Sequence, residues 1–228
     1  MLLAELSEAS GVSAASIKYY RREALLPPGR RVTATRQEYG QAHLERLALI
    51  RVLREVAGAP IARIAELTAI LDDPEQPLLT ALATAQLIAL GIPELDGERA
   101  GRCAEHPQIA PLLAELGWPD VDSAPRRALD ELLHTLEEQG MPTDGETLRR
   151  YAAPMAQIAR ADVASIGELT DAPAGAGPAP EVSDDVQVRR AVSGALAFDR
   201  LLRLLRSLGH ASYSILRAQE SGRDPASS

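Results

Sequence analysis

The sequence is poor in several residue types, and each shortage narrows what the protein can be. Its 228 residues include one cysteine, Cys103, so no disulfide can form within the chain and no thiolate-rich metal site is available. No stretch approaches the ~18 uninterrupted apolar residues of a membrane-spanning helix. The first ten residues lack the basic segment of a signal peptide. We therefore expect a cytoplasmic protein with no membrane association, no bound metal and no other cofactor.

Aromatic residues are also scarce, at 3% of the chain, and Ala and Leu dominate the hydrophobic 46%. This composition favours helices packed on helices, because Ala and Leu are strong helix formers. None of the usual catalytic motifs occurs: there is no G-x-S-x-G, no phosphate-binding loop with its lysine, and no H-E-x-x-H. The sequence therefore predicts an all-α protein that is not an enzyme.

Charge is distributed unevenly along the chain, whose formal net charge is -8. The first 71 residues contain ten basic and seven acidic residues, whereas the remainder is strongly acidic. The chain has one lysine, Lys18, and it lies in the segment "SIKYYRREALLPPG" among two tyrosines and two arginines. A basic head on an acidic body is typical of a protein in which one part binds a polyanion and the other does not.

The head has the pattern of two short helices joined by a tight turn, followed by a small hairpin. Gly11 ends the first helix, and Ser13 is placed to cap a second helix over residues 14–26 that Pro27 and Pro28 stop. Residues 29–39, "GRRVTATRQEY", suit a small hairpin or irregular wing. Further helices are expected over 41–57 and, opened by Pro60, over 61–71.

The rest of the chain reads as a series of helices separated by Gly- and Pro-containing breaks. We expect helices over 77–90, 107–118 and, capped by Ser123 and stopped by Gly140, over 124–139. Thr143 with Glu146, and Asp184 with Gln187, have capping-box spacing before the last two helices, and residues 172–183 read as a flexible linker. The predicted domains are 1–71 as the head, 72–104 as a connecting helix and loop, 105–218 as a helical body, and 219–228 as a disordered tail.

The opening residues carry a family resemblance. The run "LAELSEASGVSAASIKYYRREALLPPG" resembles the start of the MerR family of winged helix-turn-helix regulators, and "HLERLALIRVLREVAGAPIARIAEL" is similar to the family's second helical pair. Three positions depart from the family pattern: Lys18 stands for the usual arginine, Arg21 for a glutamate, and Ala24 for a glycine. The wing lacks the family's common Gly-Tyr-Arg, although Tyr39 matches its final tyrosine.

The resemblance implies a DNA-binding regulator of transcription that binds a pseudo-palindromic promoter operator as a homodimer. It also implies distortion of the spacer DNA so that RNA polymerase can engage. A helix fits the major groove, where small residues allow close approach and basic or hydroxyl groups reach phosphates and base edges. The expected DNA-binding residues are Ser13, Ala15, Ser16, Lys18, Tyr19, Tyr20, Arg21, Arg36 and Tyr39. Since consecutive helical residues point about 100° apart, one of the two tyrosines is expected in the core.

Several alternatives stay open at this point. A partner-binding adaptor that uses the helix-turn-helix to contact protein would have an uncharged or apolar second helix, which "KYYRR" argues against. The dimer contact is expected from helix 77–90 or from helix 184–217, unless the protein's own core takes up these apolar surfaces. The body either binds a small, largely apolar effector between its helices or only fixes the dimer. Cys103 with His106 is interpreted as an incidental pair, and His43 as a packing or capping residue.

Overall fold

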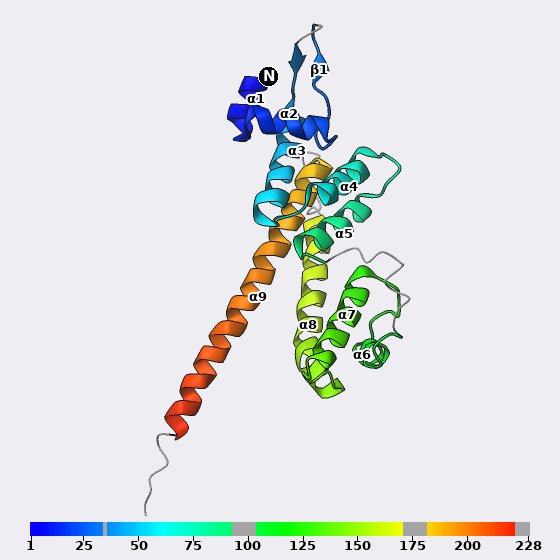
Figure 1. Cartoon of the computed structure of the whole chain (residues 1–228), viewed down its shortest axis with the longest axis vertical. Coiled ribbons are helices and arrows are strands. Elements are labelled where there is room, and N and C mark those ends of the chain that lie inside the picture. Colours follow the sequence, from blue (N-terminus) through cyan, green and yellow to red (C-terminus); the bar gives the residue numbers. More distant parts are fainter. Residues whose placement is uncertain (34–35, 93–103, 171–181, 222–228) are drawn as a thin grey trace, which may run out of the picture. The chain divides into compact units, whose positions relative to one another are not determined.

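The computed structural model describes residues 1–33, 36–92, 104–170 and 182–221, without the side chains of 165–170 and of the last two residues. The chain divides into two compact units, one formed by residues 1–91 together with 182–228 and the other by residues 92–181. Within these described ranges, every regular element is an α-helix or π-helix apart from one two-stranded sheet (Figure 1). This confirms the predicted fold class, a winged helix-turn-helix head with a helical body. No helix of the described residues combines the length and apolarity needed to cross a membrane.

The first two helices form the expected helix-turn-helix. Helix α1 covers Leu3–Ser10 and α2 covers Ala14–Arg22. Gly11 joins them at φ 67°, in the left-handed region that glycine adopts at little cost. The hydroxyl of Ser13 accepts a hydrogen bond from the backbone N–H of Ser16 at 3.0 Å, which confirms Ser13 as the cap of α2.

Helix α2 ends earlier than the sequence suggested. It stops at Arg22 because Ala24 takes a left-handed conformation, with φ 59°, before the chain reaches the two prolines. Ala24 is the described residue other than glycine with a positive φ, and it occupies the position where the resembling family has glycine. The following Leu25 and Leu26 turn inward and are fully buried.

The wing is a short antiparallel hairpin. Strand β1, Arg30–Arg31, pairs with β2, Gln37–Glu38, and Arg30 lies opposite Glu38 in the register. The hairpin is held at its base by Met1, whose backbone exchanges two hydrogen bonds with that of Tyr39, at 2.8 and 2.9 Å. A Cβ atom at Gly29 would lie 2.7 Å from the carbonyl oxygen of Glu38, so this entry to the wing requires glycine.

Two hydrophobic clusters hold the first unit together. The smaller one lies under the helix-turn-helix and contains Leu6, Ile17, Leu26, Tyr39 and Leu47. The larger one joins α3 (Gln41–Arg51), η1 (Val52–Val56), α4 (Ile61–Asp72), α5 (Leu78–Ala89) and α9 (Asp184–Ser221). Tyr20 packs against both clusters and so connects the second helix to each.

The expected single helix over residues 41–57 changes character near its end. Residues 52–56 form a turn of π-helix, in which the N–H of Ala57 donates to the carbonyl of Val52, five residues back. The N–H of Ala59 then donates to Leu53 at 2.8 Å, and Gly58 between them has φ 68°. The wider turn places Arg54 and Val56 on the exterior while Leu53 stays in the core.

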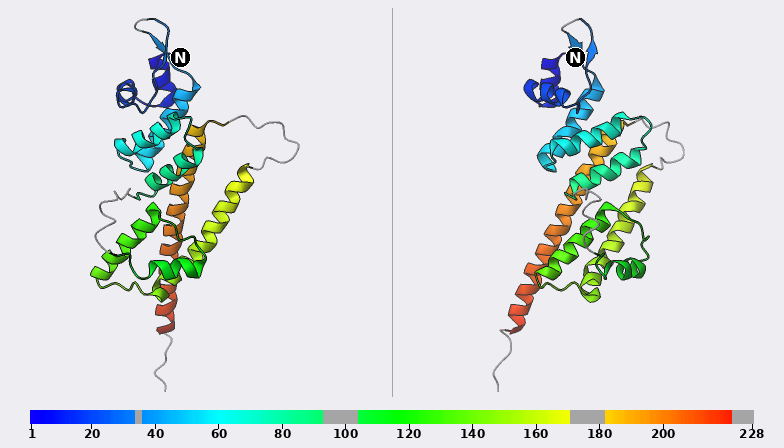
Figure 2. Two further views of the ribbon diagram at one scale, coloured as in Figure 1. Left: turned by 90° about the vertical axis from the view of Figure 1, so that its right-hand side faces the viewer. Right: turned by 45° about the vertical axis from the view of Figure 1, so that its right-hand side comes forward.

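Helix α9 belongs to the first unit, which differs from the sequence-based division of the chain. Figures 1 and 2 show its first half running along α3 and α5, with which it makes its main contacts. Val188 and Val192 are buried in the larger cluster, so the start of the last helix completes the core of the head. The predicted body of residues 105–218 is therefore split, because its last helix packs with residues far back in the sequence.

The second unit is built from α6 (Ile109–Leu116), α7 (Ala124–Glu138) and α8 (Gly145–Thr170). Ser123 caps α7 as expected, and Gly140 follows it with φ 69°. The predicted capping box of Thr143 and Glu146 is wrong. Asp144 caps α8 instead, because its carboxylate accepts hydrogen bonds from both the backbone N–H and the hydroxyl of Thr147 at 2.9 Å. These bonds to Thr147 lower the pKa of Asp144. A carboxylate is the better acceptor at a helix start, because it carries charge.

The capping box at the start of α9 is also corrected. The backbone carbonyl of Ser183 accepts from the N–H groups of Val186 and Gln187 at 3.0 Å. The side-chain amide of Gln187 reaches back to the carbonyl of Val182 at 3.0 Å, and more weakly to the Asp184 carboxylate at 3.4 Å. The linker predicted over 172–183 lies mostly outside the described residues, as does most of the predicted tail.

Replacing Ala24 by glycine should stabilise the protein. The left-handed conformation costs an L-residue with a Cβ about 1 kcal/mol that glycine avoids, so Ala24→Gly should raise the free energy of unfolding by about that amount. Ala83→Gly, at an exposed position inside α5, is the matched control and should lower it by about 1 kcal/mol. Urea denaturation measures both, and a loss of stability in Ala24→Gly similar to that of the control would contradict the assigned backbone strain.

Candidate nucleic-acid interface

Helix α2 presents a mixed face of small, basic and hydroxyl-bearing residues. Ile17 is its buried residue and anchors it in the smaller cluster. Ser13, Ala15 and Lys18 are exposed, while Ser16 and Arg21 are half-buried. The small residues of the first turn leave the backbone open to a close approach, and Lys18 extends a charge beyond them.

The two tyrosines of α2 have different surroundings. Tyr20 packs on both hydrophobic clusters, whereas Tyr19 lies half-buried beside it with the ring centroids 5.9 Å apart. The guanidinium of Arg22 sits over the ring of Tyr19, 5.3 Å from its centroid. This matches the expectation that one tyrosine faces the core, and it leaves Tyr19 as the one on the outer side.

Tyr39 joins the wing to α2 from beneath the surface. It is 4% exposed, and its hydroxyl accepts a hydrogen bond from Arg21 Nη1 at 2.9 Å. The same hydroxyl lies 3.4 Å from Gln37 Oε1, to which it donates. The guanidinium of Arg21 is therefore held between α2 and β2, and Tyr39 is placed to orient Arg21 rather than to reach a ligand itself.

The wing adds exposed basic side chains. Arg30, Arg31 and Arg36 are exposed, and Arg30 forms an ion pair with Glu38 at 2.7 Å. The carbonyl of Arg36 accepts from the N–H groups of Val32 and Thr33, and its own N–H donates to the Thr33 hydroxyl at 3.1 Å. These bonds fix the backbone of Arg36 at the turn while its side chain stays exposed.

The structure adds one residue to this surface that sequence reasoning missed. A shallow open groove on α2 is lined by Ala15, Ser16, Tyr19 and Tyr20, and across it by Arg54 and Ile61. Arg54 comes from η1, and its Nη1 donates to the carbonyl of Ala59 at 3.1 Å. The linear sequence carries no signal for this approach, because the π-helical turn that aims Arg54 shows only in three dimensions.

Not all the basic residues of the head belong to this surface. Arg46 is 4% exposed and is bound inside the unit by two carboxylates. Arg51 donates to the carbonyl of Ser10 at 3.3 Å and thereby closes the end of α1. His43 accepts from the N–H of Gly40 through Nδ1 at 3.1 Å, which confirms its capping role.

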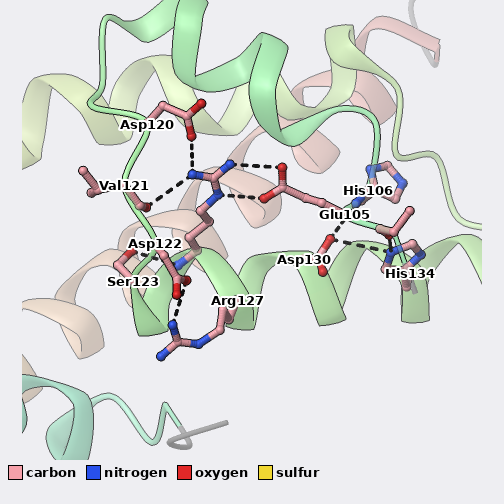
Figure 3. Close-up of polar contacts among 11 residues, drawn as sticks. Glu105, His106, Asp120, Val121, Asp122, Ser123, Arg127, Asp130 and His134 are labelled. Carbon is pink, nitrogen blue, oxygen red and sulfur yellow. Dashed lines mark hydrogen bonds and ion pairs between the residues drawn. The ribbon is translucent and has the colours of Figure 1, made fainter. Parts of the chain in front are cut away.

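The second unit contains a polar cluster around Arg126 (Figure 3). Arg126 binds both oxygens of Glu105 at 2.7 and 3.0 Å, the carboxylate of Asp120, and the carbonyl of Val121. The bonds to Glu105 and Asp120 raise the pKa of Arg126. Because Arg126 belongs to the first turn of α7, the cluster ties the segments on either side of α6 to that helix.

Two histidines lie next to this cluster. The N–H of His106 donates to Asp130 at 2.7 Å, and the rings of His106 and His134 meet edge to face with centroids 5.3 Å apart. Cys103, the other half of the predicted Cys-His pair, lies outside the described residues. Over the ranges that the structure describes, no three His, Cys, Asp or Glu side chains are grouped so that they could hold a metal ion.

Comparison with known proteins agrees with this geometry. The family model described as "MerR HTH family regulatory protein" matches residues 1–69. Among solved structures, the chain is similar to that of SCO5550, a candidate transcriptional regulator from Streptomyces coelicolor A3(2), with 31% sequence identity and a TM-score of 0.57. The likeness covers 95% of this chain and 97% of the other, so it extends beyond the head. No curated protein matches the chain.

The cap of α2 provides a direct test of how this surface is held. Ser13→Ala removes the acceptor of the Ser16 N–H and should lower the free energy of unfolding by about 1 kcal/mol. Ser16→Ala is the control: it removes only the contact between the two hydroxyls, 2.8 Å apart, and keeps the capped N–H. Thermal and urea unfolding should show that Ser13→Ala is clearly less stable than Ser16→Ala. Equal losses of stability would speak against the cap.

Proposed function

The chain belongs to the MerR family of helix-turn-helix regulatory proteins, and we propose that it regulates transcription by binding a pseudo-palindromic promoter operator as a homodimer. In this proposal α2 enters the major groove and the wing follows the adjacent backbone. The dimer bends and untwists the spacer between promoter elements, so that RNA polymerase can engage. Such a protein acts at the nucleoid in the cytoplasm.

The observation that carries the proposal is the outer face of α2. A recognition helix needs small residues where it approaches the bases and donors where it passes phosphates. Ala15 and Ser16 supply the first, while Lys18, Tyr19 and Arg21 supply the second. Arg21 is oriented in advance by the Tyr39 hydroxyl, which lowers the entropy cost when it binds a phosphate.

The surrounding basic residues extend the proposed contact along the DNA backbone. Arg36 lies in the turn of the wing, directly before β2, and Arg54 borders the groove of α2. We propose that both contact phosphates, and that Tyr20 and Tyr39 support the surface from the core. Ser13 contributes chiefly by fixing the first turn of α2.

Phosphate binding should appear in the salt dependence of the affinity. Replacing both Lys18 and Arg21 by alanine should lower affinity for the promoter DNA upstream of the protein's own gene. The slope of log K against log salt concentration should fall by about 1 for each phosphate that the variant no longer neutralises. Fluorescence anisotropy across a salt series measures both quantities. Arg160→Ala, which removes an exposed charge from α8, should change neither.

An unchanged affinity and slope in the Lys18→Ala, Arg21→Ala double variant would refute the assignment of this face to DNA. The double variant should stay folded, since both side chains can be truncated without removing a member of either hydrophobic cluster. Circular dichroism of each variant verifies this before binding is measured.

Helix α9 offers the surface that a homodimer would use. Its start is taken up by the unit's own core, where Val192 is buried and Ala195 packs against the larger cluster. From Phe198 onward it is different, because large apolar side chains there are exposed although the helix continues to Ser221. These exposed residues are Phe198, Leu201, Leu204, Leu205, Leu208, Tyr213, Ile215 and Leu216.

The spacing of these residues suits a second copy of the same helix. Phe198, Leu201, Leu205, Leu208 and Ile215 follow alternating steps of three and four residues, with Ser212 at the remaining position, which is the pattern of a coiled-coil seam. A pseudo-palindromic operator requires a two-fold partner, and an α9–α9 contact would supply it. Of the two dimer helices suggested by the sequence, 184–217 fits better, since buried residues of α5 already pack with α9 within one chain.

Charges placed in this seam should separate the two copies. Leu205→Glu with Leu208→Glu should shift the protein from dimer to monomer at micromolar concentration, because paired like charges would be buried in the contact. Ser207→Glu with Ser214→Glu adds the same charge on the outer side of the seam and should leave the dimer intact. Multi-angle light scattering decides: a monomeric wild type, or an unchanged dimer in the seam variant, would contradict the α9 contact.

Two roles are proposed for the second unit. In one, the second unit holds a small, largely apolar effector among the helices α6, α7 and α8, whose interior is formed by residues such as Ile109, Leu112 and Leu133. In the other, the unit binds no ligand and serves only the assembly. Mass spectrometry of the natively purified protein, compared with its denatured extract, distinguishes the two.

A further inference from the structure

Arg46 is a buried arginine whose hydrogen-bonding capacity is fully used. It lies on α3 and is 4% exposed. Its Nε and Nη2 donate to the two carboxylate oxygens of Asp185 at 2.5 and 3.3 Å. Its Nη2 and Nη1 donate to the two oxygens of Asp72 at 2.7 and 3.2 Å. The remaining donor of Nη1 reaches the carbonyl of Leu25 at 3.4 Å, so all five N–H groups of the guanidinium have an acceptor.

These contacts join four parts of the first unit at one point. Asp72 is the last residue of α4, and Asp185 lies in the first turn of α9. Leu25 belongs to the turn that follows α2, directly after the left-handed Ala24. Next to the guanidinium, the hydroxyl of Ser183 donates to Glu45 Oε2 at 2.6 Å. We call the set Arg46, Asp72, Asp185, Glu45 and Ser183 the α9 anchor.

In the α9 anchor one arginine lies between two carboxylates, and burial affects the charge of Arg46 and that of Asp185 differently. Burial opposes the charge of Arg46, but the hydrogen bonds with Asp72 and Asp185 outweigh it and raise its pKa. Asp185 has the opposite balance, since its burial, together with the nearby carboxylates of Asp72 and Glu45, raises its pKa more than the shared Arg46 lowers it. The hydrogen bond from Ser183 lowers the pKa of Glu45. The arginine is thus firmly charged and depends on both carboxylates.

Such an arrangement fixes angles as well as distances. A planar guanidinium bound in forks by two carboxylates allows little rotation, whereas apolar side chains in a core can slide against one another. Buried ion pairs often add little net stability compared with apolar side chains of similar volume. The geometric role is therefore the more informative property of Arg46, because it fixes the start of α9 relative to the end of α2.

We propose that Arg46 is a positioning residue that couples the dimer helix α9 to the recognition helix α2 and thereby sets which spacing between operator half-sites the dimer accepts. This inference rests on the proposed function, since it assumes that two copies of α2 read two half-sites. One base pair of spacing displaces a half-site by about 3.4 Å and rotates it about the DNA axis. A dimer whose recognition helices are rigidly fixed to the dimer helix must discriminate between such displacements.

Asp185→Asn tests this coupling. It keeps the size of the side chain and one acceptor for Nε, but it removes the charge that holds the guanidinium in a fork. Operators are first selected from random duplex DNA with the wild-type protein and then resynthesised with spacers one and two base pairs longer and shorter. We expect wild type to prefer one spacing and Asp185→Asn to lose roughly tenfold of that preference, a size typical of coupling between sites.

Two further variants make the test specific. Asp184→Asn neutralises the neighbouring carboxylate in the same turn of α9, which lies outside the anchor, and should keep the wild-type preference. Ser183→Ala removes only the bond to Glu45 and should reduce the preference in the same direction by a smaller factor. Ser183→Ala also keeps the proposal falsifiable if Asp185→Asn does not fold, because Ser183 is exposed and its truncation leaves both cores intact.

Hydrogen exchange supplies a readout that needs no DNA. In Asp185→Asn the amides of residues 20–26 should exchange faster than in wild type, although the substitution is in α9, because the Leu25 carbonyl is held by Arg46. A purely local effect would be confined to the first turns of α9. Lys18→Ala should leave this exchange unchanged and weaken binding equally at every spacing.

The outcomes separate this inference from the proposed function. If the wild type binds DNA, Lys18→Ala weakens it, and every folded anchor variant keeps both the spacing preference and the exchange of residues 20–26, the coupling through Arg46 is refuted and DNA binding stands. If the wild type selects no operator, the proposed function fails. The exchange experiment then still decides whether Arg46 joins α9 to the end of α2.

Discussion

The packing of the first turns of α9 into the head is the constraint on which the rest of the first unit depends. Val188 and Val192 are buried among residues of α3, α4 and α5, although more than 90 residues separate them from α5 in the sequence. An isolated head of residues 1–71 would expose this side of Leu49, Ile50 and Leu53 to water. The amino-terminal DNA-binding part is therefore one cooperative unit with the carboxy-terminal helix, and the stability of one is shared by the other.

This dependence reaches helix α2 through a short segment. Tyr20 packs on both hydrophobic clusters, Leu25 enters the larger one and Leu26 the smaller one. Between them the chain turns at Ala24 in a conformation that costs energy without glycine. The strain can persist because the two buried leucines on its carboxyl side determine the path. The orientation of α2 thus follows from how the two cores meet rather than from its own helix propensity.

Local features of the fold were predictable from the sequence, and long-range pairings were not. Gly11, Ser13 and Gly140 act through their own backbone or the next turn, and they ended or capped helices where predicted. The partner of α9 could not be predicted, because its apolar stripe suits a neighbouring core and a second copy equally well. In the structure, the start of the helix, as far as Leu196, packs on the core of the head, while most of the large apolar side chains from Phe198 onward are exposed. Asp144 rather than Thr143 caps α8, and the spacing alone could not show this, because both residue types are common at that position.

The residues of the candidate interface also fall into those that the sequence indicated and those that only the fold revealed. Its α2 residues were recognisable because they lie within one turn-helix motif, whereas Arg54 and the buried role of Tyr39 required the fold. The charge count of the head could not show that Arg46 is absent from the surface. Its two carboxylate partners, Asp72 and Asp185, are far from it in the sequence.

An apolar core and one ionic anchor make different contributions to holding α9 in place. Apolar burial supplies most of the free energy that holds α9 against α3 and α5, but it is non-directional and tolerates small rotations. A forked arginine adds little to that free energy, yet it penalises rotation, because each donor that leaves its acceptor inside the protein stays unsatisfied. An error of a few degrees at the start of α9 grows along a helix of 38 residues, about 57 Å in length. Angular control is therefore most effective at the first turn of α9, where Asp185 lies.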